Sequence, residues 1–428
     1  MKPSAGTRVL MILENSSYPG DGRPRRESLT LQRAGYQVSV IAPARPEQGR
    51  REVMDGVHVY RYRPHFSGGG AGGYLWEYGW ALALTFFLTL RIWWERGFDV
   101  IHAHNPPDIF ALVALFYKPF GKKFVFDHHD LAPEMYQAHF GGGSRLMFRA
   151  LVFFEKLSCK LADHIIATNE SYKRMAMERS GVSGERITVV RNGPDLTRVK
   201  LTEPDLQLRA KAPTIFGYVG AMEHQDGLDY LVRALRHLLH DLKRTDFYCL
   251  AIGDGVALEG LKQLAKQLDV QDHILFTGFV AEEDLMRYLS TPDIMVDPDP
   301  SNPFTDRSTM IKMMEYMALS KPIVAFDLPE HRVTAEDASL YAVANDEGDF
   351  AAQLVRLMDD PQLRAEMGRR GRRRVESHLQ WSHQEKCLLA AYDKICHPPR
   401  SARTAAGEAG PARITEEHAE PAVSQVCS

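Results

Sequence analysis

The stretch SNPFTDRSTMIKMMEYMALSKPIVAFDLPEHR, residues 301–332, decides the fold class of this chain. Between Met310 and Ala318 the apolar residues recur at spacings of three and four, which predicts an amphipathic helix from about Ser308 to Leu319. After a tight Ser320-Lys321-Pro322 connection, the apolar run Pro322–Asp327 predicts a buried strand. A helix that leads directly into a buried strand is typical of a parallel α/β sheet.

The start of this predicted helix is polar, with Ser308, Thr309, Lys312 and Glu315 in its first turns. Because the first turn of a helix leaves backbone N–H groups without partners and carries partial positive charge, it favours a bound anion. Glu315 lies about two turns into the helix, within reach of a ligand bound at its start. The alternative interpretation is a surface helix whose charges are solvated.

The rest of the chain alternates short β-branched runs with helical patterns. This alternation predicts parallel sheets with helices on both faces, and two sets of strands predict two Rossmann-like, doubly wound domains. The predicted strands are Arg8–Leu13, Val38–Ala42, Val57–Tyr62, Val100–His104, Phe124–Asp127, His164–Thr168 and Ile187–Val190 in the first half, then Thr214–Val219, Tyr248–Ile252, Ile274–Thr277, Ile294–Val296, Pro322–Phe326 and Ser339–Val343.

A chain of 428 residues is too long for one hydrophobic core, in agreement with two domains. The polar stretch Thr197–Pro213 marks the join, so we assign residues 1–200 to the N-terminal domain and 201–378 to the C-terminal one. Residues 397–428 are rich in Pro, Ala, Gly and charge, which predicts a disordered tail.

The composition is that of a globular protein, with 44% apolar and 25% charged residues. A net charge of -3 gives no reason to expect nucleic acid as a partner. The five cysteines form no CxxC pair and no metal-ligand spacing, which indicates a reducing compartment and no structural zinc. The first apolar run ends at Glu14 and reads as a strand rather than a signal peptide. We therefore expect a cytoplasmic protein.

One segment points to the inner face of the plasma membrane. Tyr78–Leu90 carries no charge but is shorter than the roughly 20 residues that span a bilayer. It is either a buried core helix or a helix in the membrane interface, where the neighbouring tryptophans would sit comfortably. The basic residues of the amphipathic stretch Arg145–Lys160 would add attraction to anionic lipid. Peripheral membrane contact is therefore plausible, and a true span is not.

Ligands of open α/β sheets bind outside the carboxyl ends of the strands, where this chain has several polar clusters. In the first half these are Glu14–Arg23, which lacks GxGxxG, His102–Asp108, and Asp127–Asp130 followed by Glu134. Because neighbours on a strand point to opposite faces, at most alternate residues converge. We expect these clusters to line a cleft and expect no metal.

In the second half, Gly217–Gly227 and Gly253-Asp254-Gly255 each follow a strand and lead into a helix. A single Gly-Asp-Gly is usually an ordinary turn. Two glycine-bearing strand-to-helix turns, together with the polar helix start at Ser308, favour a phosphate-bearing ligand.

Three motifs carry a resemblance to a known family. The sequence EYMALSKPIV, residues 315–324, is similar to E-A-M-A-x-G-x-P-V-I; Val190–Asp195 is similar to N-G-V-D; and Gly253–Gly255 is followed by Phe276–Gly278. From about residue 8 to 396 the chain resembles the retaining GT-B glycosyltransferases of family 4, especially the bacterial branch that builds cell-surface polysaccharides on lipid carriers. The resemblance implies two Rossmann-like domains facing a cleft, with the donor in the C-terminal domain and the acceptor in the N-terminal one. It also implies that a last helix, 379–396, returns to the N-terminal domain.

The resemblance implies roles for individual residues. Glu315 would hold the donor ribose, Ser308 and Thr309 would offer backbone N–H groups to the diphosphate, and Phe279 and Val280 would lie along the base. His129 would lie beside the transferred sugar, with Asp130 as a second catalytic candidate. Sugar transfer would retain the anomeric configuration without a metal. The remaining donor candidates are Gly220, Gln225, Gly253, Asp306, Arg307 and Lys312, and the acceptor candidates are Asp21, Arg23, His104, Asn105 and Glu134.

Two departures from the family pattern stand out. Arg307, beside Asp306, occupies the position of the family's first glutamate, and Met222 and Asp226 stand where its basic phosphate ligands usually fall. Arg307 or Lys312 would supply the missing positive charge, since arginine binds phosphate bidentately. Either Asp306 takes over the sugar contact by a one-residue shift in the loop, or Arg307 turns to the diphosphate. We prefer the second option because it accounts for both departures with one residue.

Three functions are compatible with these motifs. The first is sugar transfer from a nucleotide-sugar to a lipid-linked or saccharide acceptor in cell-surface polysaccharide synthesis. The second is nucleotide-sugar 2-epimerisation, which needs no acceptor. The third is a catalytically silent nucleotide-sugar-binding partner in a polysaccharide assembly complex.

Overall fold

The computed structural model describes residues 6–65, 71–140 and 142–396, which form two compact units. Among these residues, the first unit comprises 6–133, 143–191 and 383–396, and the second comprises 134–142 and 192–382. The predicted disordered tail, 397–428, lies outside the described residues.

The first unit is built on an eight-stranded sheet in the order β3-β4-β2-β1-β5-β6-β7-β8. Neighbouring strands pair in parallel, except β3 and β4, which are antiparallel. The strand β3 was not predicted from the sequence, because most of its residues, REVM, are exposed. The strands are β1 Arg8–Ile12, β2 Gln37–Pro43, β3 Arg51–Met54, β4 Val57–Tyr62, β5 Val100–His104, β6 Lys123–His128, β7 His164–Ala167 and β8 Ile187–Val189.

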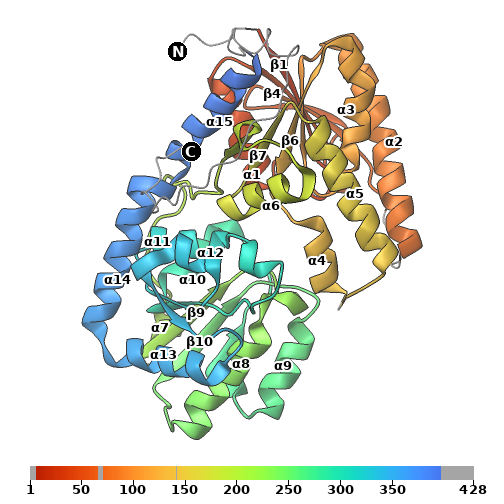
Figure 1. Cartoon of the computed structure of the whole chain (residues 1–428). Helices are drawn as coiled ribbons and strands as arrows, with labels where there is room; N and C mark the ends of the chain where they lie inside the picture. Colours follow the sequence, from red (N-terminus) through yellow and green to blue (C-terminus); the bar gives the residue numbers. More distant parts are fainter. Residues whose placement is uncertain (1–5, 66–70, 141, 397–428) are drawn as a thin grey trace, which may run out of the picture. The chain divides into compact units, whose positions relative to one another are not determined.

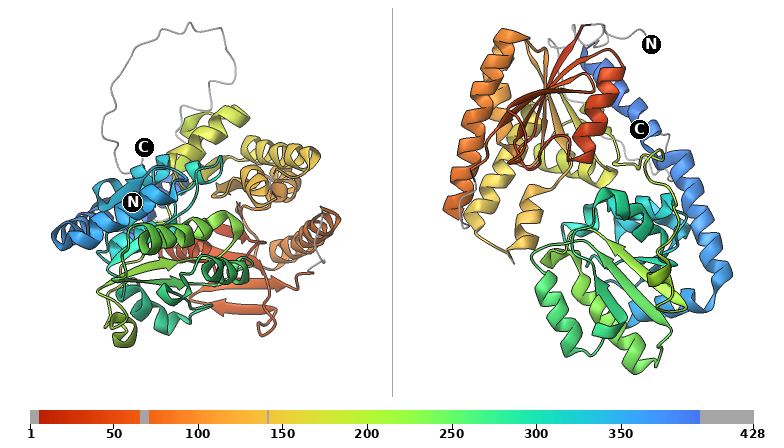
Figure 2. Two further views of the ribbon diagram at one scale, coloured as in Figure 1. Left: turned by 90° about the horizontal axis from the view of Figure 1, so that it is seen from below. Right: turned by 180° about the vertical axis from the view of Figure 1, so that it is seen from behind.

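Helices cover both faces of this sheet. Helices α2, α3 and α5 lie on one face, and α1 and α15 lie on the other (Figure 1, Figure 2). The helices of this part of the chain are α1 Gly22–Arg33, α2 Ala71–Glu95, α3 Ala111–Tyr117, α4 Ala132–His139, α5 Arg145–Leu161, α6 Glu170–Ser180 and α15 Trp381–Cys396, with short turns η1 Asp108–Phe110, η2 Lys118–Phe120 and η3 Gly184–Arg186. Among the described residues, no helix is long and apolar enough to cross a membrane.

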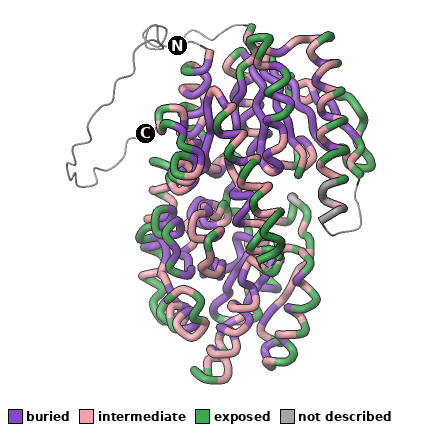
Figure 3. Tube along the Cα trace, turned by 45° about the vertical axis from the view of Figure 1, so that its right-hand side comes forward, coloured by how far each residue is buried: buried purple, intermediate pink, exposed green. Residues whose placement is uncertain are grey.

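The second unit has a six-stranded, fully parallel sheet in the order β11-β10-β9-β12-β13-β14. Its central strands are buried, as are those of the first unit (Figure 3). The strands are β9 Thr214–Val219, β10 Phe247–Ile252, β11 Ile274–Phe276, β12 Ile294–Asp297, β13 Ile323–Phe326 and β14 Ser339–Ala342. All six were predicted, because each is an apolar run short enough to be a buried strand.

Two apolar clusters pack against the two faces of this second sheet. One cluster contains side chains of α8, α9 and α13, and the other contains side chains of α10 and α11. The helices are α7 Leu206–Arg209, α8 Leu228–Arg236, α9 Leu258–Gln267, α10 Glu282–Ser290, α11 Ile311–Ala318, α12 Pro329–Ala335, α13 Glu347–Asp359 and α14 Pro361–Arg374, with short turns η4 His224–Asp226, η5 His237–Asp241, η6 Gln271–His273, η7 Thr305–Arg307, η8 Glu336–Ala338 and η9 Val375–Leu379.

The helix in residues 301–332 begins later than the sequence predicts. The helix α11 spans Ile311–Ala318, and Ser308 instead follows the 3-10 turn η7. The Ser308 N–H donates to Thr305 O at 3.1 Å, and its hydroxyl donates to Phe304 O at 2.8 Å. The expectation that Ser308 offers its backbone N–H to an anion is therefore wrong, because the η7 turn uses that group.

Candidate active site

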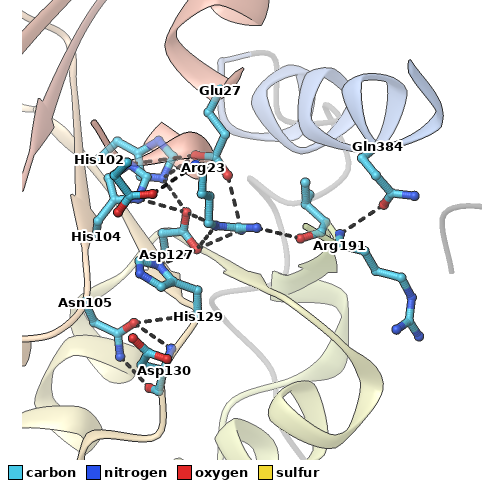
Figure 4. A network of polar contacts seen from close by, with 12 residues as sticks. Arg23, Glu27, His102, His104, Asn105, Asp127, His129, Asp130, Arg191 and Gln384 are labelled. Atoms are coloured by element: carbon cyan, nitrogen blue, oxygen red, sulfur yellow. Dashed lines mark hydrogen bonds and ion pairs between the residues drawn. The ribbon is translucent and has the colours of Figure 1, made fainter. Parts of the chain in front are cut away.

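A buried polar network lies at the carboxyl ends of β5 and β6 in the first unit (Figure 4). His102 and His104 are alternate residues of β5, and Asp127 of β6 lies directly beside His104. All three side chains are buried. Because alternate residues on a strand share a face, they converge as the spacing predicts, whereas His128 turns to the other side, against Tyr172.

The first turns of α1 bring two more charges into this network. Arg23 donates from Nε and Nη2 to the carboxylate of Asp127 at 2.9–3.2 Å and from Nη1 to Val190 O at 2.9 Å. Glu27, one helical turn further on, places Oε1 3.1 Å from Arg23 Nη2. Arg23 and Glu27 are 3% and 0% exposed, so the charge of Arg23 is matched inside the protein rather than by water.

The imidazoles fill the space between the two carboxylates. His102 Nε2 lies 3.6 Å from both Glu27 Oε2 and Asp127 Oδ2, and His102 Nδ1 bonds Tyr392 Oη at 2.8 Å. His104 Nε2 lies 3.7 Å from Glu27 Oε2, and His104 Nδ1 lies 3.2 Å from Asp127 Oδ2. The two rings stack with their centroids 4.5 Å apart.

Burial decides which members of the network are charged. It lowers the pKa of His102, and it lowers the pKa of His104 to about 3, so both imidazoles are neutral at pH 7. Burial raises the pKa of Glu27 well above its usual range. Burial also opposes ionisation of Asp127, but the Arg23 guanidinium and the two histidines outweigh it, and the pKa of Asp127 lies well below normal. These shifts favour a network with one ion pair, Arg23 with Asp127.

This charge balance bears on metal binding. Glu27, His102, His104 and Asp127 each offer one ligand atom, and these atoms lie within 4.8 Å of one another. A divalent cation is held by deprotonated carboxylates and neutral imidazoles. Here, however, Arg23 already neutralises Asp127, and burial favours the neutral form of Glu27. A divalent ion would leave net positive charge buried, so the residues do not call for one.

The loop after β6 holds the catalytic candidates His129 and Asp130. Asn105 Oδ1 accepts the backbone N–H groups of both residues, at 2.8 and 3.0 Å, and Asn105 Nδ2 donates to Asp130 O at 2.7 Å. His129 Nδ1 lies 3.5 Å from Asp127 Oδ1, and its side chain is 11% exposed. Burial would lower the pKa of His129, but the bond and charge of Asp127 outweigh it and raise this pKa above normal. Burial raises the pKa of Asp130.

The five acceptor candidates have different surroundings. Arg23, His104 and Asn105 are buried within the network just described, and Glu134, on α4, is also buried. Asp21 is half-buried, caps α1 by accepting the Arg23 N–H, and lines a cavity of about 450 Å³ in the first unit. Glu14, Ser16, Arg45 and Glu77 also line this cavity. Burial, with the charge of Glu77, raises the pKa of Glu14 to about 7.

In the second unit, a buried set of charges lies at the carboxyl end of β12. Lys312 Nζ lies 3.2 Å from Asp297 Oδ1 and 2.5 Å from Asp299 Oδ2, and 4.9 Å from the ring centre of Tyr218. His331 Nε2 lies 3.6 Å from Asp297 Oδ2. Burial and the neighbouring Asp297 raise the pKa of Asp299 well above normal, whereas the nearby Lys312 ammonium lowers it. Lys312 is thus paired inside the protein.

Close backbone contacts define the glycine turns beside this set. Gly220 and Gly253, after β9 and β10, have φ values of +155° and +140°. A Cβ atom on Gly253 would lie 1.8 Å from Gly220 O, so a larger residue does not fit there. Gly253 N also donates to Gly278 O at 3.3 Å, which joins the turns after β10 and β11.

The other donor candidates lie around the same strand ends. Glu315 is half-buried on α11, and Thr309 donates its hydroxyl to Glu330 at 3.2 Å. Asp306 accepts from Ser301 Oγ at 2.9 Å, and Arg307 donates to Pro303 O at 2.5 Å. Phe279 is 83% exposed and Val280 is half-buried, whereas Gln225 belongs to the turn η4.

Several members of these sets had no individual role predicted from the sequence. His102 and Asp127 were expected only as part of the clusters that line a cleft, and Glu27, Asp297, Asp299 and His331 were not named as site residues. Three signals were available. His102 and Asp127 alternate with His104 and His129, which were selected. Asp297 and Asp299 alternate after a predicted strand in the sequence DPDP. For Glu27, the Arg-x3-Glu spacing of a helical ion pair was the available signal.

Two protein-family models match consecutive parts of the chain. The model described as Glycosyltransferase Family 4 matches residues 26–198, and the model described as Glycosyl transferases group 1 matches residues 202–374. The chain is a family 4 glycosyltransferase. This family is retaining and independent of metal, and its members use nucleotide-sugars.

Relatives of this glycosyltransferase differ in their acceptors. The 2-deoxystreptamine glucosyltransferase of Streptomyces kanamyceticus is 23% identical over 327 residues, which are 74% of this chain and 82% of that protein. The phosphatidyl-myo-inositol mannosyltransferase of Mycolicibacterium smegmatis is 26% identical over 383 residues, which are 85% of this chain and 87% of that protein.

Solved structures show that the glycosyltransferase has the GT-B fold. WaaG, a glycosyltransferase involved in lipopolysaccharide biosynthesis, aligns with a TM-score of 0.65 at 16% identity, over 91% of this chain and 100% of that one. Anabaena HepE in complex with UDP-glucose aligns with a TM-score of 0.67 at 16% identity, over 90% of this chain and 99% of that one.

Proposed function

We propose that this glycosyltransferase moves a sugar from a nucleotide-sugar to a lipid-linked or saccharide acceptor in cell-surface polysaccharide synthesis, at the inner face of the plasma membrane. The observation that carries this proposal is the aromatic face of the first unit. We define the aromatic face as Trp76, Trp80, Phe87 and Trp94 of α2 with Leu112, Leu115, Phe116 and Phe120 of α3 and η2.

The helix α2 exposes large aromatic side chains and buries several small or polar ones beside Ile92. Its buried side includes the small or polar residues Ala81, Thr85 and Thr89, whereas Phe87 and Trp94 are 67% and 92% exposed. A helix that packs only against a protein core would bury its large aromatic residues and expose its threonines. Exposed aromatic rings favour the membrane interface, where one side of the ring is apolar and the other is hydrated.

The aromatic face continues from α2 onto α3 and η2. The Phe86 ring lies 5.0 Å from that of Phe116, and the Trp93 ring lies 5.1 Å from that of Phe120. The neighbouring helix α5 exposes Leu146 and Phe153 together with basic residues, which are Arg145, Arg149, Lys156 and Lys160. Apolar side chains bordered by basic ones suit a membrane that carries anionic lipid.

The cavity beside Asp21 suits a saccharide acceptor, because carboxylates and an arginine line it and can bond hydroxyl groups. One of its residues, Glu77, belongs to α2, so the cavity adjoins the helix that carries part of the aromatic face. A lipid-linked acceptor would place its sugar in this cavity and its lipid beside α2. We therefore retain Asp21 as an acceptor residue, with Glu134 as a further candidate.

For the donor, we propose Glu315 at the ribose, Phe279 and Val280 along the base, and the turns at Gly220, Gln225 and Gly253 near the phosphates. Because Lys312 is already paired with Asp297 and Asp299, we propose Arg307 as the cation for the diphosphate. Thr309 and Asp306 would then face the sugar. His129 would bond a hydroxyl of the transferred sugar, with Asp130 beside it.

The names of relatives are consistent with a lipid acceptor, since one is a phosphatidyl-myo-inositol mannosyltransferase and WaaG acts in lipopolysaccharide biosynthesis. A small soluble acceptor, as in the name of the 2-deoxystreptamine enzyme, would need no aromatic face. The test for the donor is a thermal-shift panel of UDP-, GDP- and ADP-sugars, in which a ligand at 100 times its Kd stabilises by about 2.7 kcal/mol. Product formed without any acceptor would indicate epimerisation, and donor binding without turnover would indicate a silent partner.

Membrane contact is tested by sedimentation with vesicles. The protein should sediment with vesicles that contain phosphatidylglycerol more than with pure phosphatidylcholine, and the double variant Phe87→Ser/Trp94→Ser should lose most of this binding. Val343→Ser, which replaces a side chain 61% exposed in the second unit, is the matched control and should bind like wild type. Equal binding by all three proteins would exclude the aromatic face as the membrane contact.

A further inference from the structure

Asp127 lies near the end of β6, and His129 is the first residue after this strand. Because they are two residues apart, their side chains lie on the same side of the extended backbone. Asp127 Oδ1 lies 3.5 Å from His129 Nδ1. We propose that Asp127 is a positioning residue: fixed by Arg23, it receives the Nδ1–H of His129 and leaves Nε2 as the nitrogen that meets the transferred sugar. This inference rests on the proposed place of His129 beside that sugar.

The carboxylate is held firmly enough for this task. Arg23 binds it through Nε and Nη2 at 2.9–3.2 Å, in the two-pronged geometry that fixes a carboxylate in one orientation. Its two oxygens have separate neighbours, since Oδ2 faces His104 Nδ1 at 3.2 Å and Oδ1 faces His129. A short movement of the His129 ring closes the 3.5 Å gap to a hydrogen bond, and such bonds often shorten when substrate binds.

The backbone of His129 is fixed independently of its ring. Asn105 accepts the N–H of His129 at 2.8 Å and that of Asp130 at 3.0 Å, which fixes the backbone that carries the imidazole. A hydrogen bond from Nδ1 to Asp127 would then select one tautomer and one orientation of the ring. Neutral imidazole protonated at Nδ1 accepts a hydrogen bond at Nε2, which suits a sugar hydroxyl.

Neighbouring charged groups shift the pKa of the His129 ring. The groups that influence it are Asp127 and Asp130, which favour its protonated form, and Arg23, which opposes it. His104 lies with its ring centre 5.7 Å away and is neutral. Removing the charge of Asp127 leaves Asp130 as the remaining acid that favours the protonated ring, against burial and Arg23, so the pKa of His129 should fall.

The first test is the tautomer and titration of His129 in the wild-type protein. Two-dimensional NMR of protein with ¹⁵N-labelled histidine, with the signals assigned by comparison with His129→Gln, reports both. We expect the Nδ1–H tautomer and a midpoint above the ordinary value of about 6.5. An Nε2–H tautomer would overturn the proposal, and this measurement needs no activity.

The second test is the variant Asp127→Asn, with Glu155→Gln as its matched control. Glu155 is also fully buried and pairs with an arginine, Arg179, at 2.5 Å, so both variants break a buried ion pair. We expect Asp127→Asn to lower kcat by at least about 10²-fold with donor KM within about threefold of wild type, as for loss of an interaction made in the transition state. The pH dependence of its kcat should also move to lower pH, whereas that of Glu155→Gln should not.

Equal losses of kcat in both variants, with unchanged pH profiles, would mean that Asp127 acts only through stability and would overturn the proposal. If Asp127→Asn does not fold, the tautomer of the wild type decides. If the wild type binds nucleotide-sugar but transfers nothing, the proposed function fails, while the tautomer measurement still tests the link between Asp127 and His129.

Discussion

Replacing Lys312 by methionine should destabilise the second unit strongly. Methionine keeps most of the side chain that packs near Tyr218 but removes the ammonium between Asp297 and Asp299. Burial and Asp297 raise the pKa of Asp299 well above normal, which favours its protonated form. The substitution therefore leaves Asp297, which is fully buried, without its cation.

The distance sets the size of the effect. At 3.2 Å and an effective dielectric constant of 20, the pair of Lys312 with Asp297 is worth about 5 kcal/mol before desolvation. Breaking a buried pair by removing one partner costs roughly 3–5 kcal/mol in measured cases. We expect a loss in that range, a large part of the roughly 5–15 kcal/mol that stabilises a typical domain.

Urea unfolding followed by far-UV circular dichroism measures this loss, with variants that separate charge from packing. Asp299→Asn, which resembles the protonated acid, should cost less than about 1 kcal/mol, as for a shape-conserving change of a neutral group. The double variant Lys312→Met/Asp297→Asn should recover much of the loss of the single variant, because no unpaired charge remains. A loss below about 1 kcal/mol for Lys312→Met, the usual value of an exposed pair, would refute the reasoning. So would a double variant no more stable than the single one.

Three further predictions concern single residues. Glu315→Gln should weaken nucleotide-sugar binding at least several-fold in calorimetry, since a hydrogen bond to a charged group contributes roughly 1.5–3 kcal/mol; unchanged affinity would remove Glu315 from the donor site. Arg307→Glu should lower the affinity for nucleoside diphosphate and nucleotide-sugar alike, whereas Asp306→Asn should mainly change the choice of sugar; unchanged or improved diphosphate binding by Arg307→Glu would contradict this role. Burial raises the pKa of Asp108 to about 8, so the folded protein keeps this carboxyl protonated at pH values where the unfolded chain ionises it, and stability falls as pH rises towards 8. As pH rises from about 6 to 9, wild type should lose roughly 2–3 kcal/mol that Asp108→Asn retains, and parallel stability curves would count against this.

The sheets could be predicted from the sequence because their strands are apolar runs between polar turns. Short runs such as Ile294–Val296 and Val100–His104 are typical of strands buried in a parallel sheet, and the structure buries both. The strand β3 escaped prediction for the opposite reason: Arg51, Glu52 and Val53 are exposed at the edge of the sheet and show no core-facing pattern.

The helix in residues 301–332 shows where local pattern stops being sufficient. The apolar spacing correctly gave α11 its buried side, Met313, Met314 and Met317. It did not give the start of the helix, because the preceding residues form the turn η7, held by hydrogen bonds from Ser308 to Thr305 and Phe304. A polar residue before an apolar helix is compatible with either arrangement, and the choice depends on neighbours that are distant in the sequence.

The buried network in the first unit also contains contacts that the sequence alone could not indicate. The alternation of His102 with His104 and of Asp127 with His129 indicated which residues share a face, and the structure brings all four together. What the sequence could not indicate is that α1 delivers Arg23 to this point, because Arg23 and Asp127 are 104 residues apart. An exposed arginine near the first strand would be a reasonable acceptor contact. Arg23 is instead buried and donates its hydrogen bonds to Asp127, so it is not available to an acceptor. Through Asp127 it acts on the imidazole of His129, two residues further along. The burial of one side chain therefore moves its expected role from binding the acceptor to orienting His129.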